Sequence, residues 1–480
     1  MIYDQIFFTK ALNNPEFITY GISLEQFFAK NNISSFDIDS RTVNKNEIFI
    51  ALCGQKVDGH NFIEEVLQKD ISGLIININK KYILDKINEN LLKDKLIILV
   101  PDSLQALKDL AQYWRAQFNF PIIGITGSVG KTTTKNILHH IFTQAGILSF
   151  ASHKNQNTII GICLNILKLR DFHKFGIFEM GISHIGEMEE LANYLRPDIG
   201  VITYISPAHT QGLENIKIIL QEKLKIFSYF KQNNIAIVYG DKEIIKNSCN
   251  NFPVITFGKK TSNNIQARKI KLIEIKDKLN QTTNLHTRFI LKIYNQKYPV
   301  LLPVFHDGLL NNSLAAAAIA THLKIDQYFI IRGIESYSST EGRFEKIKLK
   351  NNLGLIINDC YNASPESMKA AIKAFSLIKS TGQKIAVLGD MLELGKTEKT
   401  WHKNLGKFLQ KFNNINKLIL VGNNAQLIAQ TAPTDIVKYN AQNWQEAQAL
   451  LNNILNNNNN LILLKASHSM GLENIVNGLK

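Results

Sequence analysis

The chain has 480 residues, which is too long for a single hydrophobic core and suggests about three domains. A hydrophobic content of 45% argues against a disordered protein. The 55 basic and 40 acidic residues give a formal net charge of +15, but the lysines are spread among Asn and Ile rather than gathered in a basic block. The charge therefore favours acidic small-molecule substrates over nucleic acid.

The cysteine spacing and the N-terminus indicate where the protein works. The four cysteines form no Cys-x-x-Cys pair, so neither a zinc site nor a disulfide framework is predicted. The N-terminus has no signal-peptide pattern, and no apolar run approaches the ~18 residues of a membrane-spanning helix. We expect a cytoplasmic protein without membrane insertion.

The first predicted region, residues 1–114, places a short apolar strand at 48–52 between two polar turns. Ser40 and Arg41 precede the strand, and Asp58 and His60 follow it. A guanidinium and a hydroxyl could hold a phosphate or the edge of a uracil there. On these residues alone, a structural arginine in a turn is the better interpretation.

An apolar run, a glycine-rich turn and a Lys-Thr pair open the second region, residues 115–338. The pattern predicts a buried strand at 121–125 and a helix that begins near Lys131 and ends at Gly146. In that setting the loop amides and the helix dipole would bind a phosphate, and the Thr132 hydroxyl would ligate Mg²⁺. Because the first glycine is one residue early for the usual phosphate-loop pattern, an ordinary glycine-rich turn is the alternative.

Two later strands of this region end in possible metal ligands. The run 175–178 leads to Glu179, and the run 199–203 leads to His209. Open α/β sheets bind ligands at the carboxyl ends of their strands, so both side chains could hold a metal near the phosphates. A single Glu or His is more often structural, but two at equivalent strand ends favour the metal.

Lys223 shares a helical stripe with apolar residues, including Ile219 and Ile226. A lysine on such a face usually extends its ammonium to water. The alternative is a desolvated, neutral amine that reacts with carbon dioxide to give a metal-binding carbamate. Spacing alone favours the first interpretation.

The rest of this region alternates strands and helices, as in a doubly wound sheet. Strands are predicted at 235–238 and 254–257, and a strong helix at 312–320. Residues 259–300 are polar and poorly patterned, so we expect an excursion at the edge of the domain.

The third region, residues 339–480, repeats the alternation with strands predicted at 355–357, 385–388, 418–421 and 461–464. Ser364 and Pro365 are suited to begin a helix. The asparagine tract 456–460 is expected to be a solvated loop.

Several stretches together resemble one family, the ATP-dependent Mur ligases of peptidoglycan synthesis. General family marks are the stretch 126–134, Glu179-Met-Gly181, Ala208-His209 and Gly342-Arg343. The stretches 359–365, 388–395 with His402, and Lys465-Ala-Ser467 resemble the members that add D-alanyl-D-alanine to UDP-N-acetylmuramoyl tripeptide. Their order and spacing make an accidental match very improbable.

The resemblance implies a three-domain α/β fold: a domain for the uridine nucleotide, a central P-loop-type ATPase sheet, and a C-terminal Rossmann-like domain that receives the amine. It implies ATP and Mg²⁺ as cofactors, an acyl-phosphate intermediate, and a protein that we expect to be a monomer. It also implies that Lys223 is the carbamylated lysine, which reverses the interpretation from spacing.

The resemblance assigns site residues by position. The expected ATP contacts are Gly127, Ser128, Val129, Gly130, Lys131, Thr132, Thr133, Asn312, Arg343 and Asp359. The expected metal ligands are Thr132, Glu179, His209 and Lys223, and the catalytic residues are Lys131, His209 and Lys223. The expected substrate contacts are Ser40, Arg41, Asp58, His60, Asn155, Asn157, Tyr361 and Asn362.

The chain departs from the family pattern at several of its positions. Thr158, Tyr204 and Tyr239 stand where Asn is usual, Gly308 where His is usual, and His468 where Arg is usual. The phosphate loop and the expected metal ligands keep the pattern.

The motifs bear on four rival functions. A sister ligase that adds the third residue would carry an Asp-Asn-Pro-Arg-like motif, which is absent, and folylpolyglutamate synthase lacks the Tyr-Asn-Ala-Ser-Pro stretch. The remaining two rivals are a P-loop ATPase that acts on nucleic acid and a non-catalytic nucleotide-binding module.

Overall fold

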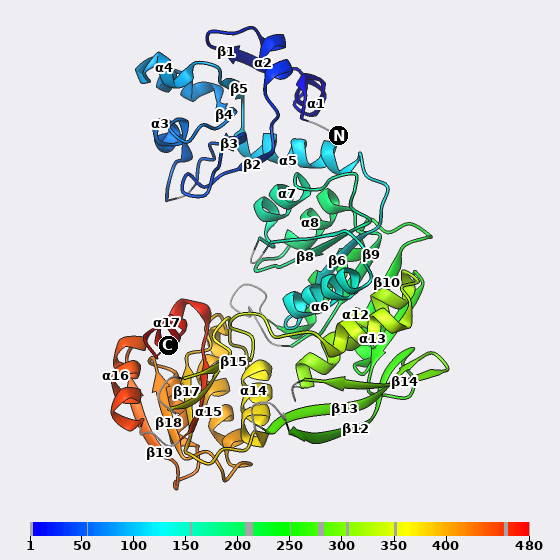
Figure 1. Ribbon diagram of the computed structural model, residues 1–480, viewed down its shortest axis with the longest axis vertical. Coiled ribbons are helices and arrows are strands. Elements are labelled where there is room, and N and C mark those ends of the chain that lie inside the picture. Colours follow the sequence, from blue (N-terminus) through cyan, green and yellow to red (C-terminus); the bar gives the residue numbers. More distant parts are fainter. Residues whose placement is uncertain are drawn as a thin grey trace.

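The computed structural model describes residues 3–54, 56–153, 156–206, 215–249, 251–276, 283–303, 307–349, 353–455 and 459–479. These residues form three sheets, one within each predicted region. In Figure 1 the three bodies follow the chain, from the N-terminal body in blue, through the central body in green, to the C-terminal body in orange and red. The three-domain α/β fold is confirmed, and the boundaries near 114 and 338 stay a prediction.

The N-terminal body has a sheet with the strand order β1-β5-β4-β3-β2. All neighbouring pairs are parallel except β1 and β5. The strands are β1 (Glu16–Thr19), β2 (Ser35–Asp37), β3 (Glu47–Ile50), β4 (Gly73–Asn77) and β5 (Leu96–Val100). The α-helices are α1 (Gln5–Ala11), α2 (Leu24–Lys30), α3 (Ile63–Leu67), α4 (Glu89–Leu92) and α5 (Ser103–Arg115).

The central body is built on a sheet with the order β14-β13-β12-β11-β10-β9-β6-β8-β7. Its strands are β6 (Ile122–Thr126), β7 (Ser149–Ala151), β8 (Phe175–Glu179), β9 (Ile199–Ile202), β10 (Ile235–Tyr239), β11 (Val254–Gly258), β12 (Ile265–Lys276), β13 (Thr283–Ile293) and β14 (Gln296–Leu302). Its α-helices are α6 (Lys131–Gln144), α7 (Ile159–Ile166), α8 (Glu187–Leu195), α10 (Ile216–Leu224), α11 (Glu243–Asn247), α12 (Asp307–His322) and α13 (Gln327–Glu335). The predicted strands at 121–125, 235–238 and 254–257 and the helix at 312–320 are confirmed.

The parallel part of this sheet is covered on both faces, which explains its continuous apolar runs. Successive residues of β6 face opposite sides: Ile122 packs in the core beneath α5, α7 and α8, whereas Ile123 and Ile125 pack beneath α6, α12 and α13. Strand β6 lies between β8 and β9. The loop after β6 therefore lies between the ends of β8 and β9, where open α/β sheets bind ligands.

The excursion predicted at 259–300 lies at the edge of the central sheet, but its strands were not predicted. Residues 265–276, 283–293 and 296–302 form long strands, β12 to β14, which extend the edge of the sheet in antiparallel pairing. Phe289, Leu291 and Ile293 are buried while Lys292 alternates with them. One face of these strands is solvated, so polar residues alternate with buried apolar ones. The segment therefore lacks the continuous apolar runs by which the other strands of this sheet were predicted.

The C-terminal body has the strand order β15-β16-β20-β17-β18-β19. Its strands are β15 (Glu345–Lys348), β16 (Gly354–Asn358), β17 (Lys384–Gly389), β18 (Lys417–Val421), β19 (Val437–Ala441) and β20 (Asn460–Lys465), and its α-helices are α14 (Pro365–Leu377), α15 (Glu398–Leu409), α16 (Trp444–Ile454) and α17 (Glu473–Leu479). The edge strands β15 and β19 were not predicted. Ser364 caps α14 and Pro365 begins it, as expected.

The asparagine tract 456–460 ends in a strand residue. Residues 456–458 lie outside the described residues, but Asn460 is buried at the start of β20. Its side chain accepts from the Gln383 amide and donates to the Leu353 carbonyl. The prediction of a solvated loop is therefore wrong at Asn460, whose buried side-chain amide is hydrogen-bonded to the backbone of two neighbouring segments.

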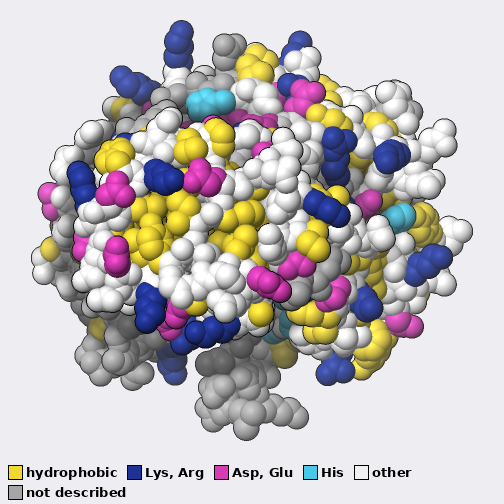
Figure 2. Space-filling view, turned by 90° about the horizontal axis from the view of Figure 1, so that it is seen from above, with side chains coloured by type: hydrophobic (Ala, Val, Ile, Leu, Met, Phe, Trp, Pro, Cys, Tyr) yellow, Lys and Arg dark blue, Asp and Glu magenta, His cyan; other side chains and the backbone are white. Residues whose placement is uncertain are grey.

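Charges are mixed on the face seen in Figure 2, where Lys and Arg are interspersed with Asp and Glu. This face carries no continuous basic surface of the kind that binds nucleic acid. None of the helices in the described part of the chain combines the length and apolarity that a membrane crossing requires.

Candidate active site

The phosphate loop joins the end of β6 to the start of α6. Gly127 has φ +147° and Gly130 has φ +92°, both in the region that disfavours side chains. A Cβ on Gly127 would lie 2.0 Å from Thr203 Oγ1, and one on Gly130 would lie 2.3 Å from Asn312 Oδ1. The glycines thus bring the loop against β9 and α12, and the first amides of α6 point to the same space.

Lys131 is the first residue of α6, and its ammonium donates to the Gly127 carbonyl at 3.0 Å. Burial lowers the pKa of its amine, which the Glu179 carboxylate opposes and the Arg343 charge reinforces. A buried cation with little compensation gains from an anion placed beside it. The other N–H groups of the ammonium remain for such a ligand.

Thr132 and Glu179 form a buried oxygen pair beside the loop. The Thr132 hydroxyl donates to Glu179 Oε2 at 2.6 Å, and the Asn157 amide donates to Oε1 at 3.1 Å. Hydroxyl and carboxylate oxygens are the hard ligands that Mg²⁺ prefers. Asn157, predicted as a substrate contact, orients Glu179 in this structure.

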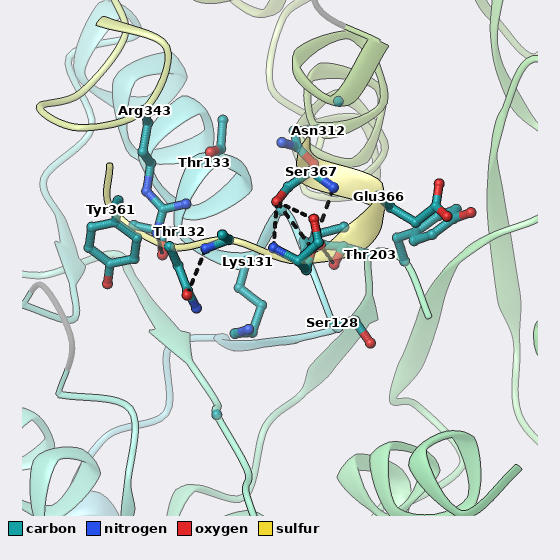
Figure 3. Close-up of a pocket in the computed structure, with 18 of the residues that line it drawn as sticks. Ser128, Lys131, Thr132, Thr133, Thr203, Asn312, Arg343, Tyr361, Glu366 and Ser367 are labelled. Carbon is teal, nitrogen blue, oxygen red and sulfur yellow. Dashed lines mark hydrogen bonds between the residues drawn. The ribbon is translucent and has the colours of Figure 1, made fainter. Parts of the chain in front are cut away.

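Arg343 reaches this pair from the segment that leads into the C-terminal body. Its Nη2 donates to Thr132 Oγ1 at 2.8 Å, and its guanidinium lies 3.7 Å from the centre of the Tyr361 ring. Figure 3 shows Arg343 beside Thr132 and Tyr361. The C-terminal body therefore contributes a cation directly to the phosphate loop.

A cavity of about 1010 Å³ contains these groups and extends between the central and C-terminal bodies. Its size is at the upper end of ordinary ligand sites, so it has room for a nucleotide and part of a second molecule. Asp307 bridges the two bodies at its edge, with Lys259 at 2.8 Å and Lys373 at 2.7 Å. Of the predicted site residues, the cavity is lined by Ser128, Val129, Gly130, Lys131, Thr132, Thr133, Asn157, Glu179, Asn312, Arg343, Asp359, Tyr361 and Asn362.

Lys223 is buried on α10, with 2% of its surface exposed. It does not extend to water, so the snorkelling interpretation is wrong. Burial lowers the pKa of its amine well below the usual value, and the charge of Lys131 lowers it further. The negative charges of Glu222 and Glu179 oppose this lowering of the pKa.

Glu222, which the sequence did not single out, connects α10 to α8. Its Oε1 accepts from the amides of Gly186 and Met188 at 2.8 and 3.2 Å, and its Oε2 pairs with Lys225 at 3.0 Å. The carboxylate is 2% exposed and caps the positive end of α8. Because Glu222 is on α10 and the amides that it caps are at the start of α8, no spacing of residues in the sequence indicates this contact.

We predict that Glu222→Ala lowers the free energy of unfolding by about 2 kcal/mol, because the buried Met188 amide and the more exposed Gly186 amide lose their acceptor. Urea unfolding of the variant and of Gln221→Ala, an exposed neighbour on the same helix, measures the difference. Equal stability of the two variants would contradict a structural role for this carboxylate.

The residues predicted to hold the uridine nucleotide lie in the N-terminal body, away from the residues that line the cavity. Ser40 is buried and its carbonyl accepts from Lys69. Arg41 is exposed and forms a two-pronged ion pair with Asp39, which lowers the pKa of Asp39 to about 2. These positions stay a prediction.

His60 is buried and both of its ring nitrogens have partners. Nδ1 lies 2.6 Å from Asp58 Oδ1, and Nε2 accepts from the Asn77 amide at 3.1 Å. The ring therefore fixes the turn that presents Asp58.

His209 and Asn155 lie outside the described residues. No group of three His, Cys, Asp or Glu side chains suited to a metal occurs among the residues that are described.

Three family models cover most of the chain: the Mur ligase family catalytic domain at residues 32–115, the Mur ligase middle domain at 125–320, and the Mur ligase glutamate ligase domain at 342–468. The chain is 32% identical to a UDP-N-acetylmuramoyl-tripeptide--D-alanyl-D-alanine ligase of Bacillus subtilis, over 92% of both chains. The chain belongs to the Mur ligase family.

Other relatives give the same picture for this Mur ligase. The protein of the same name from Rickettsia prowazekii is 31% identical over 93% of this chain and 95% of its own. A MurF ligase from Thermotoga maritima, solved in complex with ADP, has a TM-score of 0.75 at 25% identity, covering 93% and 96% of the two chains. A MurF structure from Acinetobacter baumannii has a TM-score of 0.82 at 24% identity, covering 100% and 99%, and supports the fold.

Proposed function

We propose that this Mur ligase joins D-alanyl-D-alanine to UDP-N-acetylmuramoyl tripeptide at the expense of ATP, giving the pentapeptide precursor of peptidoglycan. The observation that carries the proposal is the meeting of the phosphate loop with Arg343 of the C-terminal body over one cavity. Relatives similar over nearly the whole chain carry the name of this activity.

The nucleotide fits the charges of the phosphate loop. Lys131 and the first amides of α6 supply donors for the outer phosphates, and Arg343 supplies a second cation from the opposite wall. Thr133 and Asn312 line the cavity on the α6 and α12 sides. We therefore assign ATP to the central side of the cavity.

The donor set beside the loop fits Mg²⁺. Thr132 and Glu179 would hold the ion, with His209 and Lys223 as the further ligands that the family resemblance implies. When bound, Mg²⁺ would neutralise charge on the phosphoryl oxygens. If Thr132 Oγ1 gave up its hydrogen bond from Arg343 to hold the ion, that N–H of the guanidinium would become available to a phosphate.

The reaction needs an activated carboxyl group, because a free carboxylate is a poor electrophile. The terminal carboxylate of the tripeptide attacks the γ-phosphorus, ADP leaves, and an acyl phosphate forms. Lys131 and Arg343 stabilise the charge on the phosphoryl oxygens in that step. The amine of D-alanyl-D-alanine then attacks the acyl carbon, loses a proton, and displaces phosphate.

The cavity walls would exclude water while the acyl phosphate exists. The ion pairs of Asp307 with Lys259 and Lys373 join the two bodies along one edge. We assign the amine substrate to the C-terminal side of the cavity, where Tyr361, Asn362 and the first turn of α14 lie. A soluble nucleotide substrate is consistent with a cytoplasmic enzyme, which we propose to be a monomer.

The decisive experiment measures phosphate release with ATP, Mg²⁺ and UDP-N-acetylmuramoyl tripeptide. D-Alanyl-D-alanine should support turnover, whereas single amino acids, including glutamate and diaminopimelate, should not. Turnover with a single amino acid would assign the chain to a sister ligase. Hydrolysis stimulated by DNA or RNA instead would support the nucleic-acid ATPase.

For the N-terminal body we predict that Arg41→Ala weakens binding of the uridine nucleotide roughly tenfold to a hundredfold, through loss of charged hydrogen bonds. Titration calorimetry with UDP-N-acetylmuramoyl tripeptide measures this. Lys45→Ala, an exposed ion-paired lysine of the same body, is the matched control. A dissociation constant unchanged by Arg41→Ala would remove this residue from the site.

A further inference from the structure

Lys465 is a buried lysine at the carboxyl end of β20, and none of the roles proposed for the ligation reaction uses it. Only 2% of its side chain is exposed, yet it lines the cavity. Its ammonium lies 2.6 Å from Asp359 Oδ2 and donates to the carbonyls of Asn362 at 2.9 Å and Asp359 at 3.3 Å. These three contacts of the ammonium go to the loop that follows β16.

Asp359 connects Lys465 to the segment that carries Arg343, because its carboxylate contacts both. Its Oδ1 accepts from the Phe344 amide at 3.0 Å, while its Oδ2 holds Lys465. The Tyr361 amide donates to the Gly342 carbonyl at 3.0 Å, on the other side of Arg343. Residues 342 and 344 are therefore both attached to the loop that Lys465 holds.

Arg343 lies between these two attachment points. Its guanidinium crosses the cavity to Thr132 Oγ1 and lies against the Tyr361 ring. Phe344, which follows Arg343 directly, has φ +56°, an uncommon backbone conformation for a residue with a side chain that needs support from its surroundings. A small change in the loop would redirect the guanidinium.

We propose that Lys465 is a positioning residue for the ligation reaction, which acts through Asp359 and the Phe344 amide to aim Arg343 at the phosphate loop. This inference rests on the proposed function. A buried ion pair contributes little net stability compared with apolar residues of the same size, so stability alone does not account for it. The geometry of the pair offers another reason for a lysine here, because the Lys465 ammonium holds the loop after β16 at both Asp359 and Asn362.

The test is a double-mutant cycle between Lys465→Met and Arg343→Ala. We expect Lys465→Met to lower kcat roughly a hundredfold, the cost of a misplaced charged group, with a smaller change in the KM for ATP. In the Arg343→Ala background the same substitution should change kcat less than about twofold, because the group that it aims is already absent. Equal effects in the two backgrounds would overturn the proposal.

Lys384→Met is the matched control. Lys384 is a buried lysine of the same sheet, at the start of β17, and its ammonium donates to the Ser376 carbonyl at 2.7 Å. Its loss should lower the urea midpoint but act independently of Arg343→Ala. If Lys384→Met depends on the Arg343 background as strongly as Lys465→Met, the coupling reflects general loosening and the proposal fails.

A second variant covers the case in which Lys465→Met does not fold. A binding measurement distinguishes failure of the proposed function from failure of the proposed role of Lys465. Lys465→Gln keeps a donor for the Asn362 carbonyl and replaces Lys465→Met if that variant does not fold. The dissociation constant of ADP should rise with Lys465→Met in the wild-type background and stay unchanged in the Arg343→Ala background. An unmodified chain that binds ADP but lacks ligase activity would refute the proposed function, whereas additive effects on ADP binding would refute the role of Lys465.

Discussion

Replacing Lys131 with alanine is expected to abolish the phosphate release that depends on both ATP and the amine acceptor. The ammonium lies at the start of α6, beside the Thr132 and Glu179 pair, in the wall of the cavity that would take the phosphates. Charge on the phosphoryl oxygens grows in the transition state, and the loss of one such donor in a shielded site costs roughly a thousandfold in kcat.

The fold should survive this change. The described contact of the ammonium is a single hydrogen bond to Gly127, and removal of a buried cation relieves a desolvation cost. Coupled phosphate-release assays and thermal unfolding are compared with those of Lys174→Ala, an exposed lysine that precedes β8. Near-normal turnover of Lys131→Ala would contradict the assignment of the phosphate loop, and a lost thermal transition would show a structural role instead.

The phosphate loop was predictable because everything that makes it is local. A buried strand, glycines at the two tight turns, and an amphipathic helix follow one another between residues 121 and 146, and the structure has β6, the loop and α6 in those places. Glu179 was predictable for a related reason. It follows β8, which lies beside β6, and parallel strands end at the same edge.

Contacts between distant segments were not predictable. Lys465 and Asp359 are 106 residues apart in the sequence, and no spacing rule connects the ends of β20 and β16 before the strand order is known. Glu222 is similar, because its partners are amides of α8. The family resemblance marked Lys465 and Asp359 separately, but the contact between them is visible only once the strand order is known.

Lys223 is a position where the local sequence pattern predicted the wrong solvent exposure for a side chain. The apolar stripe on its helix was recognised, but spacing alone favoured an ammonium in water. In the structure Ile216 is the exposed member of that stripe, whereas Lys223 is buried with Ile219. The family resemblance reversed the interpretation, and the burial agrees with the reversal.

Lys223→Ala is expected to lose at least roughly a hundredfold in kcat, and millimolar acetate or propionate should restore part of it. The buried amine, beside the charge of Lys131, is favoured in its neutral form. A neutral amine attacks carbon dioxide, an N–C bond forms, and a proton leaves to give a carbamate, which is a carboxylate-like oxygen ligand. A small carboxylate that enters the space left by the shortened side chain would supply similar oxygens.

Lys217→Ala provides the control, because Lys217 is exposed on the same helix and should neither lose activity nor respond to acetate. Rescue should follow carboxylate size, since the space that a buried lysine leaves is narrow, and formate and acetate should act better than butyrate. Lys223→Met fills the space without oxygen ligands, so it should resist rescue. If no carboxylate restores Lys223→Ala while Mg²⁺ affinity is normal, Lys223 acts as a buried amine and the carbamate is excluded; rescue of Lys223→Met as well would place the carboxylate elsewhere in the cavity.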